Sequence, residues 1–596
     1  QPTGPETGGT LTLTPNSRPQ TPSERYNIEP TRTARPPRLD GVLEDAEWVN
    51  AAVIDKFVQQ EPSEGEPATE RTVVRLMYDE HALYVAVQAF DSVASGVIAT
   101  EMRRDSRQLL DEDNFQLILD TFNDKRSGYM FVTSPLGAKL EQQIAEEGEG
   151  GYRRVSSTNA NVNLDWDGVW DVSAQRTDQG WVAEMAIPMV TMRFPDADRQ
   201  IWGVNFMRNI RRKNEQVFWA PIPRAYSLTR VSLAGTMAGI GDVDRGLDLR
   251  VTPYVLGGGK QQLEGAVLEP SGFSDVGLDV KYGVASGLNL DLTLNTDFAQ
   301  VEVDTQQINL TRYNLRFPEK RPFFLENSDL FRVGKGRDLD LFFSRRIGIA
   351  DGQAVPILGG GRITGRIAGL TVGFLDIQTE SVDSVAPANN FGVVRVMKEL
   401  PNRTRIGAAF VSRYNTDDTD DYNYTGALDG RLGIGEALTL DGYVAASSTP
   451  GTENDQTSLE LSGQWTSRDW DFRAQYRRVG EGFNPEVGFS PRGAHQFRSV
   501  YGLRHIRVDG IDWFKELRPH FSYREHLSLD GFSETRHWHL DSHFEFANGA
   551  FFQLPGVNFR REGLREPFEI SDGIFIPAGT YDNPDWGFRF NTDLSA

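Results

Sequence analysis

Residues 288–294 read LNLDLTL, a segment in which every second residue is leucine and the residues between are polar. Because successive side chains of a β-strand point to opposite faces of the sheet, this order makes one face apolar and the other polar. The same alternation recurs in WDFRAQYR at 470–477 and in HWHLDSHFEF at 537–546. The pattern predicts antiparallel strands that are apolar on one side and charged on the other.

Strands of this kind are typical of outer-membrane β-barrels, in which the apolar face meets lipid and the polar face lines a hydrated lumen. Short connections are predicted near residues 286, 368, 401, 435 and 468. Long polar connections are predicted near residues 265, 384, 418, 452 and 530. This alternation matches barrels with short periplasmic turns and long outer loops. The alternative is a large soluble sandwich, but soluble sheets seldom carry charges on the second face of so many strands.

The fold class predicted for residues 246–596 is therefore a large antiparallel transmembrane β-barrel. We count about fifteen or sixteen strands, and we expect the barrel to be incomplete at the C-terminus because a terminal aromatic strand is not found. The first strand, near 248–258, ends in a long loop and so starts on the periplasmic side. The domain before it is expected in the periplasm, unless the chain threads back through the pore.

The stretch from Asn295 to Gly348 breaks the alternation, because it is rich in phenylalanine and arginine, and two prolines argue against a regular helix. Counting the predicted strands on both sides of this stretch leaves their alternating direction inconsistent by one strand. It therefore either adds a spanning strand or crosses the lumen, and we predict a plug-like segment at 297–340. Its charges either pair to hold the segment or filter substrate. If the segment folds into the lumen, we expect Arg312 to Arg321 to face acids of the barrel wall and its phenylalanine pair to dock on apolar residues. The residues of this predicted network are Arg312, Arg316, Glu319, Lys320, Arg321, Glu326, Arg345 and Arg346.

Residues 1–35 are rich in proline, threonine, serine and glycine, which predicts a flexible lead. Residues 36–240 contain many short strand-like segments and few helical windows, which predicts a β-sandwich. Four segments resemble the family 9 carbohydrate-binding module: LDGVLEDAEW (39–48), YDEHALYVAVQAFD (78–91), DEDNFQLILD (111–120) and GWVAEMAIP (180–188). The resemblance implies a β-sandwich that binds sugar between aromatic side chains and carries calcium.

A second resemblance lies downstream. It is carried by residues 293–331, by LFFSRRIG at 341–348 and by ILGGGRITGR at 357–366. These segments resemble a bacterial family of unknown function, DUF5916, in which a family-9-like module precedes a C-terminal β-barrel. The resemblance implies this architecture and no established activity.

Trp166 and Trp170, in LDWDGVWD, are the candidates for a sugar-stacking face, with Asp167 bonding hydroxyls. The alternative is a pair of packed core tryptophans beside turn aspartates, and the family motif does not decide which ring would stack. Asp111, Asp113 and Asp165 are the candidate calcium ligands, because calcium takes six to eight oxygen ligands and favours loop carboxylates.

Seven of the eight histidines fall between residues 495 and 543. His537, His539 and His543 share the polar face of one predicted strand. Alternate strand residues lie ~6–7 Å apart, so two of them could share a metal only with help from a neighbour such as His520. The alternative is a hydrated lumen wall.

Composition excludes several classes of function. The chain of 596 residues has no cysteine, which excludes disulfides and cysteine-based metal centres, and its net charge of -22 argues against a nucleic-acid partner. No GxSxG, HExxH or phosphate-loop motif is present, so enzyme activity stays open and rests only on the association of family 9 modules with glycosidases.

The sequence therefore predicts an outer-membrane β-barrel protein that binds, and passes, carbohydrate or other small polar ligands. One alternative is an envelope scaffold or plugged barrel whose sandwich binds a protein partner. The other is a carbohydrate-active hydrolase of O-glycosyl bonds. The expected partners are outer-membrane lipid, lipopolysaccharide and a glycan, and the ligand and oligomeric state stay open.

Overall fold

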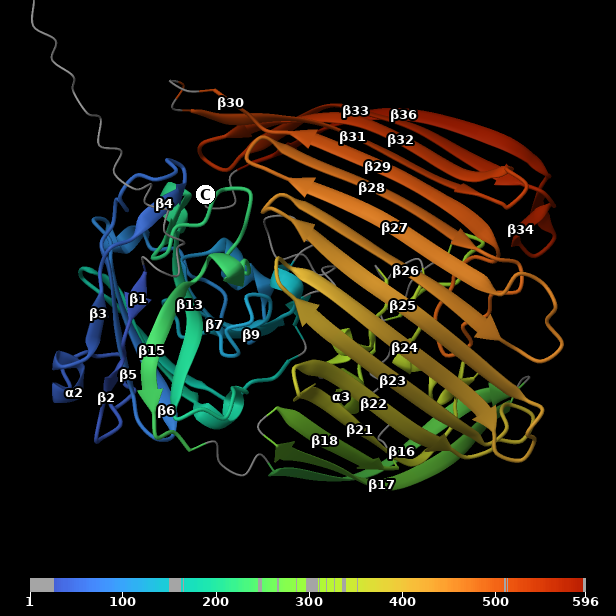
Figure 1. The fold of residues 1–596 in the computed structure, drawn as a ribbon. Helices are drawn as coiled ribbons and strands as arrows, with labels where there is room; N and C mark the ends of the chain where they lie inside the picture. The colour runs from blue at the N-terminus through green and yellow to red at the C-terminus, as the bar shows by residue number, and fades with distance from the viewer. Residues whose placement is uncertain are drawn as a thin grey trace, which may run out of the picture.

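The computed structural model describes residues 26–148, 162–164, 166–244, 249–264, 267–285, 287–295, 309, 311–317, 319–325, 327–334, 339–350, 352–508, 511 and 513–592. Two bodies of β-structure lie side by side, an N-terminal one and a large curved sheet (Figure 1). None of the helices in these residues has the length and apolar content needed to cross a membrane.

The N-terminal body is built from two sheets. The first contains β1 (Asn27–Ile28), β15 (Gly235–Gly241), β13 (Arg199–Ile210), β7 (Asn114–Asp120), β8 (Gly128–Thr133), β9 (Lys139–Ile144), β10 (Val162–Asn163), β14 (Glu215–Phe218) and β4 (Val58–Glu61). The second contains β11 (Asp171–Thr177), β12 (Gly180–Pro188), β6 (Ala82–Phe90), β5 (Thr72–Tyr78), β2 (Thr31–Arg32) and β3 (Ala52–Ile54). Aromatic and aliphatic side chains from both sheets form one core, so the predicted β-sandwich is confirmed.

Helical turns in the described residues are short. They are α2 (Ala46–Val49), α3 (Pro322–Leu325), η1 (Ala94–Gly96), η2 (Arg107–Asp111), η3 (Glu146–Gly148), η4 (Met189–Thr191), η5 (Arg211–Lys213), η6 (Val231–Leu233), η7 (Ser328–Phe331) and η8 (Ser344–Arg346). In the sandwich, α2 places Trp48 so that its indole Nε1 donates to Glu184 Oε1 at 2.7 Å. The backbone N–H of Gly41 donates to the other oxygen of Glu184, also at 2.7 Å. Two of the family-9-like segments, 39–48 and 180–188, are thus joined through one buried carboxylate.

The predicted flexible lead is partly wrong. Residues 1–25 lie outside the described residues, but β1 pairs in parallel with β15, and β2 pairs in parallel with β5. These two-residue strands complete sheet edges, and their backbone hydrogen bonds are independent of side-chain pattern. A composition rule for flexible segments could not detect them.

The large sheet follows the chain as an antiparallel meander. Its strands are β16 (Leu249–Glu264), β17 (Val267–Ala285), β18 (Leu288–Leu294), β21 (Ile357–Ile367), β22 (Leu370–Thr379), β23 (Asn389–Leu400), β24 (Thr404–Asn415), β25 (Tyr422–Ile434), β26 (Leu438–Ser448), β27 (Thr457–Thr466), β28 (Trp470–Val479), β29 (His495–Arg504), β30 (Ile506–Arg507), β31 (Phe514–Leu527), β32 (Ser533–Phe546), β33 (Phe551–Leu564) and β36 (Gly579–Asn591). Two small hairpins, β19 (Ile349–Ala350) with β20 (Gln353–Ala354) and β34 (Phe568–Ser571) with β35 (Ile574–Ile576), stand apart from it.

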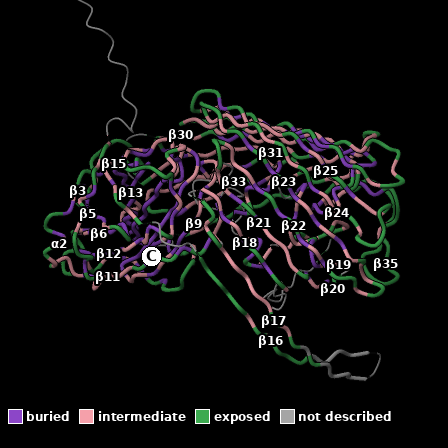
Figure 2. Tube along the Cα trace, turned by 60° about the horizontal axis from the view of Figure 1, so that its bottom comes forward, coloured by how far each residue is buried: buried purple, intermediate pink, exposed green. Residues whose placement is uncertain are grey.

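The edges of this sheet are β16 and β36, which are not paired with each other in the described part of the chain. Figure 2 shows the β16–β17 hairpin projecting away from the rest of the sheet. The predicted antiparallel strand series is therefore confirmed, whereas closure into a complete ring is not among the observed pairings.

Burial along the large sheet is inverted relative to a soluble protein. In β18, Asn289, Asp291 and Thr293 are buried, while Leu292 and Leu294 are 42% and 58% exposed. Other exposed apolar residues are Phe374, Ile406, Phe410, Leu428, Val444, Leu461, Phe472 and Leu540. Other buried polar residues are Arg362, Arg395, Thr425, Ser458, Glu460, Arg477, Glu516 and Asp541. A soluble sheet buries its leucines, so this distribution matches a sheet whose outer face meets lipid.

The segment between β18 and β21 folds against the inner face of the sheet. Because β18 pairs directly with β21, the prediction of an extra strand between them is wrong. Phe323 and Phe324 are buried with Leu375 and Ile377 of β22, whose inward positions are apolar where the segment packs. The docking predicted for this phenylalanine pair is confirmed.

Candidate functional site

The sandwich lies against the end of the large sheet that carries its short turns. Arg126 donates from Nη2 to the carbonyl oxygens of Leu400 and Thr404, at 3.1 and 2.6 Å, and forms an ion pair with Glu399. At the next turn, the Tyr226 hydroxyl donates to the carbonyl oxygen of Glu436 at 3.1 Å. The sandwich therefore covers one mouth of the space that the curved sheet surrounds (Figure 1).

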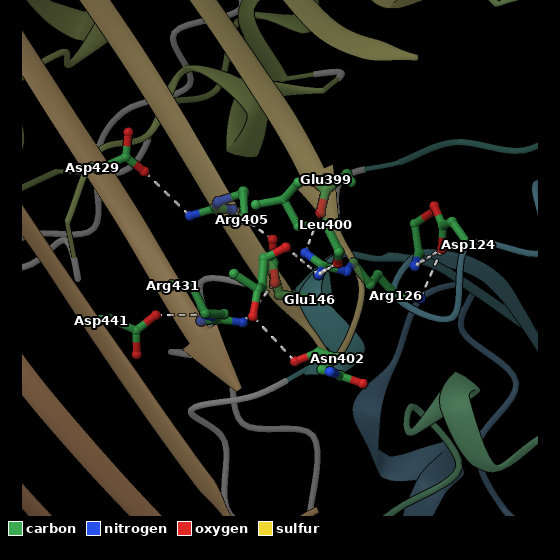
Figure 3. Close-up of polar contacts among 12 residues, drawn as sticks. Asp124, Arg126, Glu146, Glu399, Leu400, Asn402, Arg405, Asp429, Arg431 and Asp441 are labelled. Carbon is green, nitrogen blue, oxygen red and sulfur yellow. Dashed lines mark hydrogen bonds and ion pairs between the residues drawn. The ribbon is translucent and has the colours of Figure 1, made fainter. Parts of the chain in front are cut away.

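Glu146 is the central contact of this interface. It follows β9 of the sandwich and points between β24 and β25, as Figure 3 shows. Its Oε1 accepts from Arg405 Nη1 at 2.5 Å, and its Oε2 accepts from Arg431 Nη1 at 2.6 Å. Arg405 and Arg431 are directly opposed in the β24–β25 register. Like charges in such a pair repel, so the carboxylate from the sandwich compensates two cations of the sheet wall.

Further carboxylates complete this arginine cluster. Arg431 Nε donates to Asp441 Oδ1 at 2.7 Å, and Asp429 receives two hydrogen bonds from Arg395, at 2.5 and 2.8 Å. A separate ion pair joins Asp124 of the sandwich to Arg366 of β21. The contact surface is thus made of charged groups that pair across two bodies and could separate into water.

The electrostatics of Glu146 depend on this docking. Burial by itself would raise the pKa of Glu146, but the guanidinium charges of Arg405 and Arg431 outweigh burial and hold the pKa below its ordinary value. Glu146 and Glu147 also have left-handed backbone conformations, with φ of 48° and 58°. Non-glycine residues adopt such angles only where surrounding structure compensates the strain, which marks this turn as specialised.

A cavity of about 530 Å³ lies behind this contact, between the sandwich and the inner face of the sheet. Its wall combines paired acids and arginines with three tyrosines, Tyr129, Tyr443 and Tyr501. The segment from Asn327 to Gly334 forms another part of its wall. Tyr129 and Tyr443 are buried in the cores of the sandwich and the sheet, so Tyr501 is the more accessible of the three rings. Bidentate hydrogen-bonding groups beside this ring suit a small ligand with several hydroxyls or a carboxylate.

The predicted stacking face is not available in this structure. Trp166 and Trp170 are 8% and 2% exposed and belong to the sandwich core. The ring of Trp166 lies 4.9 Å from that of Tyr129, and Trp170 donates through Nε1 to Glu141 at 3.0 Å. Neither ring has an open face for a sugar, so the alternative named above, packed core tryptophans, describes them.

The other predicted ligands in the sandwich are separated. Asp167 is exposed and pairs with Arg104 at 2.7 Å. Asp113 is fully buried, accepts from the backbone N–H of Ile98 at 2.8 Å, and burial raises its pKa to about 6. Asp111 instead lines a larger cavity of about 1900 Å³. Asp165 lies outside the described residues, and calcium binding stays a prediction.

The charged residues predicted to form one network form separate contacts. Arg321, fully buried, donates to both oxygens of Glu319, at 2.8 and 2.7 Å, and to the carbonyl oxygen of Ser344 at 2.9 Å. Arg316 pairs with Asp340 at 2.8 Å. Arg312 donates to the carbonyl oxygen of Gly563 and lies 3.8 Å from Glu562, an acid of β33 in the sheet. Arg345 contacts the Phe317 ring, and Arg346 donates to the carbonyl oxygen of Gly488.

The pairs of Arg316 with Asp340 and of Arg321 with Glu319 both lie inside the segment. The expectation that Arg316 and Arg321 face acids of the barrel wall is therefore wrong. A partner close in sequence is reached at a smaller loss of chain entropy. Lys320 is half-buried beside Glu319. Glu326 lies outside the described residues.

Sequence reasoning missed the pairing of Glu146 with Arg405 and Arg431. Glu146 is separated from each arginine by more than 250 positions, and only the β24–β25 register brings the two arginines opposite each other. The available signal was an acidic turn in the sandwich together with one arginine near the start of β24 and one near the end of β25.

Two family models match the chain. Residues 39–217 match the carbohydrate family 9 binding domain-like family, and residues 246–384 match a domain of unknown function, DUF5916. No curated protein matches the chain.

Solved structures with some similarity fall into two groups. A family 9 carbohydrate-binding module from Caldicellulosiruptor kristjanssonii, in complex with cellotriose, has 15% identity and a TM-score of 0.24, and the match covers 37% of this chain and 96% of that one. OccK11 (OpdR) from Pseudomonas aeruginosa has 12% identity and a TM-score of 0.25, covering 80% and 93%. A BenF-like porin from Pseudomonas fluorescens Pf-5 has 9% identity and a TM-score of 0.26, covering 80% and 97%. At these low scores, the fold assignment rests on this chain's own strand pairing and burial. The chain therefore contains a carbohydrate family 9 binding domain-like region at 39–217, followed by a DUF5916 domain at 246–384.

Proposed function

We propose that this protein is an outer-membrane β-barrel whose periplasmic mouth is capped by its family-9-like domain. The cavity between the barrel and this domain binds a carbohydrate or another small polar ligand. The ligand passes through the barrel when the domain moves away from the mouth. The observation that carries this proposal is the insertion of Glu146 between Arg405 and Arg431 of the sheet wall. A contact made of ion pairs closes the mouth and can be opened by hydration of the same groups.

The membrane location is supported by the inverted burial of the large sheet. Its exposed leucines and phenylalanines would be unfavourable in water over so many strands, whereas lipid makes them favourable. The short turns lie at the end that the sandwich covers, and short turns of such barrels face the periplasm. This arrangement supports the predicted periplasmic position of the N-terminal domain.

The ligand class is supported by the chemistry of the cavity wall. Arginine and carboxylate side chains make bidentate hydrogen bonds to hydroxyl and carboxylate groups, and the half-buried ring of Tyr501 can pack on the apolar face of a sugar. A volume of about 530 Å³ suits a ligand of a few sugar units or smaller. The cavity replaces Trp166 and Trp170 as the place where we expect the ligand to bind.

Reconstitution of the full chain into a planar bilayer tests this function. We expect rare, short openings from the unmodified protein and a blockade of the current when neutral or acidic oligosaccharides are added. Frequent openings are expected after Glu146→Gln. If neither protein conducts, and no oligosaccharide binds the detergent-solubilised chain in calorimetry, the proposal is wrong.

A second candidate function is a closed barrel that serves as an envelope scaffold. The favouring observation is that the segment between β18 and β21 spans the enclosed space. It contacts the sandwich through Gln143 and Asn327, at 3.3 Å, and the β28–β29 connection through Asp340 and Phe489, at 2.9 Å. In this alternative the segment is a fixed plug, and Glu146→Gln leaves the bilayer without current.

A further inference from the structure

Strands β31 and β32 bring three metal-binding side chains together on the polar face of the large sheet. His520 lies directly opposite Asp541, and His539 precedes Asp541 by two residues on the same face. The Nε2 atoms of His520 and His539 are 3.2 Å apart, and His539 Nε2 lies 3.4 Å from Asp541 Oδ2. One donor atom from each residue lies within 4.8 Å of the other two.

The hydrogen bonds behind the two histidines turn their lone pairs toward each other. His539 Nδ1 lies 2.8 Å from Asn558 Oδ1, and His520 Nδ1 lies 3.4 Å from the carbonyl oxygen of Arg518. Both of these oxygens are acceptors, so each Nδ1 carries the proton and each Nε2 holds a free lone pair. The Asn558 amide is itself oriented, because its Nδ2 donates to Asp585 at 2.7 Å.

Two facing lone pairs repel unless a cation lies between them. In a tetrahedral zinc site with Zn–N bonds of about 2.0–2.1 Å, two ligand nitrogens lie about 3.3–3.4 Å apart. The separation of the His520 and His539 nitrogens, 3.2 Å, is close to this value. The hydrogen bonds from Nδ1 to an oxygen are those that orient metal-bound histidines in general.

Asp541 supplies an independent observation. Its Oδ2 accepts from Gln553, but its Oδ1 is buried and has no hydrogen-bond partner among the described residues. Asp541 is only 6% exposed. A buried carboxylate oxygen without a donor is unfavourable, and a bound cation would offset this cost. The β32–β33 register shifts between Leu540 and His543, and such bulges redirect the side chains within them.

The site is open on one side. His520 and His543 line the cavity of about 1900 Å³ between the sandwich and the sheet, so an ion can reach it. His543 Nε2 lies 3.8 Å from Asp541 Oδ2, beside the three donors. We propose that His520, His539 and Asp541 bind a divalent transition metal of the zinc type, with His543 next to the remaining coordination position. Two imidazoles and one carboxylate favour zinc, copper or nickel over calcium and magnesium, which prefer sites made of oxygen ligands.

Titration of the full chain with Zn²⁺ tests the proposal. Detergent-solubilised protein is treated with a chelator and titrated in competition with a fluorescent zinc indicator, and Co²⁺ absorption reports the coordination geometry. We expect one ion per chain, and a loss of at least ~100-fold in affinity for His520→Ala and for His539→Ala. The matched control is His81→Gln, which changes an exposed histidine of the sandwich outside this site and should bind as the unmodified protein does.

A second pair of variants separates ligation from folding. Asn558→Leu removes the acceptor behind His539 and should weaken zinc binding ~10–100-fold. Asn558→Asp combined with Asp585→Asn keeps an acceptor behind His539 and a donor to orient it, and should retain binding. Near-ultraviolet circular dichroism checks that each variant is folded. The proposal is overturned if the unmodified chain takes up no Zn²⁺, or if His520→Ala binds as tightly as His81→Gln. If the alanine variants do not fold, equal affinity of the two Asn558 variants overturns it instead.

Discussion

Removal of the Glu146 carboxylate should favour separation of the family-9-like domain from the mouth of the barrel. Glu146→Gln abolishes the charge that lies 2.5 Å from Arg405 and 2.6 Å from Arg431, while both arginines keep another carboxylate nearby. Breaking a fully buried pair costs about 3–5 kcal/mol, and the remaining partners and partial exposure reduce this to about 2–3 kcal/mol. Since 1.4 kcal/mol is about tenfold, the undocked population should rise ~30- to 140-fold.

The matched control is Glu486→Gln. Glu486 also pairs with an arginine of the sheet wall, Arg413 at 2.7 Å, but it lies in the β28–β29 connection and makes no contact with the sandwich in the described residues. Single-channel recording should show the increased opening only for Glu146→Gln. Equal behaviour of the two variants would refute the role assigned to Glu146.

The absence of cysteine allows a direct check of cap movement. Tyr226→Cys with Glu436→Cys places two thiols at the contact between the sandwich and a short turn. Joining them with a short bifunctional thiol reagent should abolish the openings that Glu146→Gln produces, and cleavage of the reagent should restore them. Persistent openings in the joined protein would show that the sandwich does not gate the space.

Three further predictions concern the pH dependence of docking, the stability of the segment between β18 and β21, and the membrane location. First, the pKa of folded Glu146 lies below its ordinary value of 4.5. The docking energy from this carboxylate is therefore present above pH 4.5 and is lost as the pH falls through the lowered pKa. Acidification should raise channel opening in the unmodified chain more than in Glu146→Gln. Second, Arg321→Ala leaves Glu319 buried without its cation. Denaturant titrations should show a free energy of unfolding lowered by about 3–5 kcal/mol. The control Arg32→Ala, at an exposed ion pair, should change it by under about 0.5 kcal/mol. Third, Leu428→Arg, at a side chain 62% exposed on the outer face, should reduce insertion into vesicles by about 2–4 kcal/mol; unchanged insertion would contradict the membrane location.

Strand faces were readable from the sequence because side-chain direction in a strand depends only on local backbone geometry. The alternation in residues 288–294 correctly separated buried Asn289 and Asp291 from exposed Leu292 and Leu294. The composition of 295–348, rich in phenylalanine and arginine, correctly marked a segment outside the strand series. The predicted break in the up–down order was wrong, because β18 pairs antiparallel with β21 and the alternation of strand directions continues.

Candidate sites were far less readable. Trp166 and Trp170 sit in a polar, aspartate-rich motif that suits a ligand surface, yet the two sheets of the sandwich enclose them. Arg321 was expected to pair with the barrel wall, but Glu319 competes from two residues away. Burial and partner choice depend on which distant surfaces pack together, and no local pattern contains that information.

By itself, the sequence determined the all-β class, the two-part order and the face of each strand, since periodicity acts over a few residues. Only the tertiary structure decided which residues from distant strands share a site. The register of β24 with β25 creates the arginine pair that receives Glu146, and the register of β31 with β32 brings His520 beside His539 and Asp541. A shift of one residue in the β24–β25 register would remove the arginine pair, and the same shift in the β31–β32 register would separate His520 from Asp541.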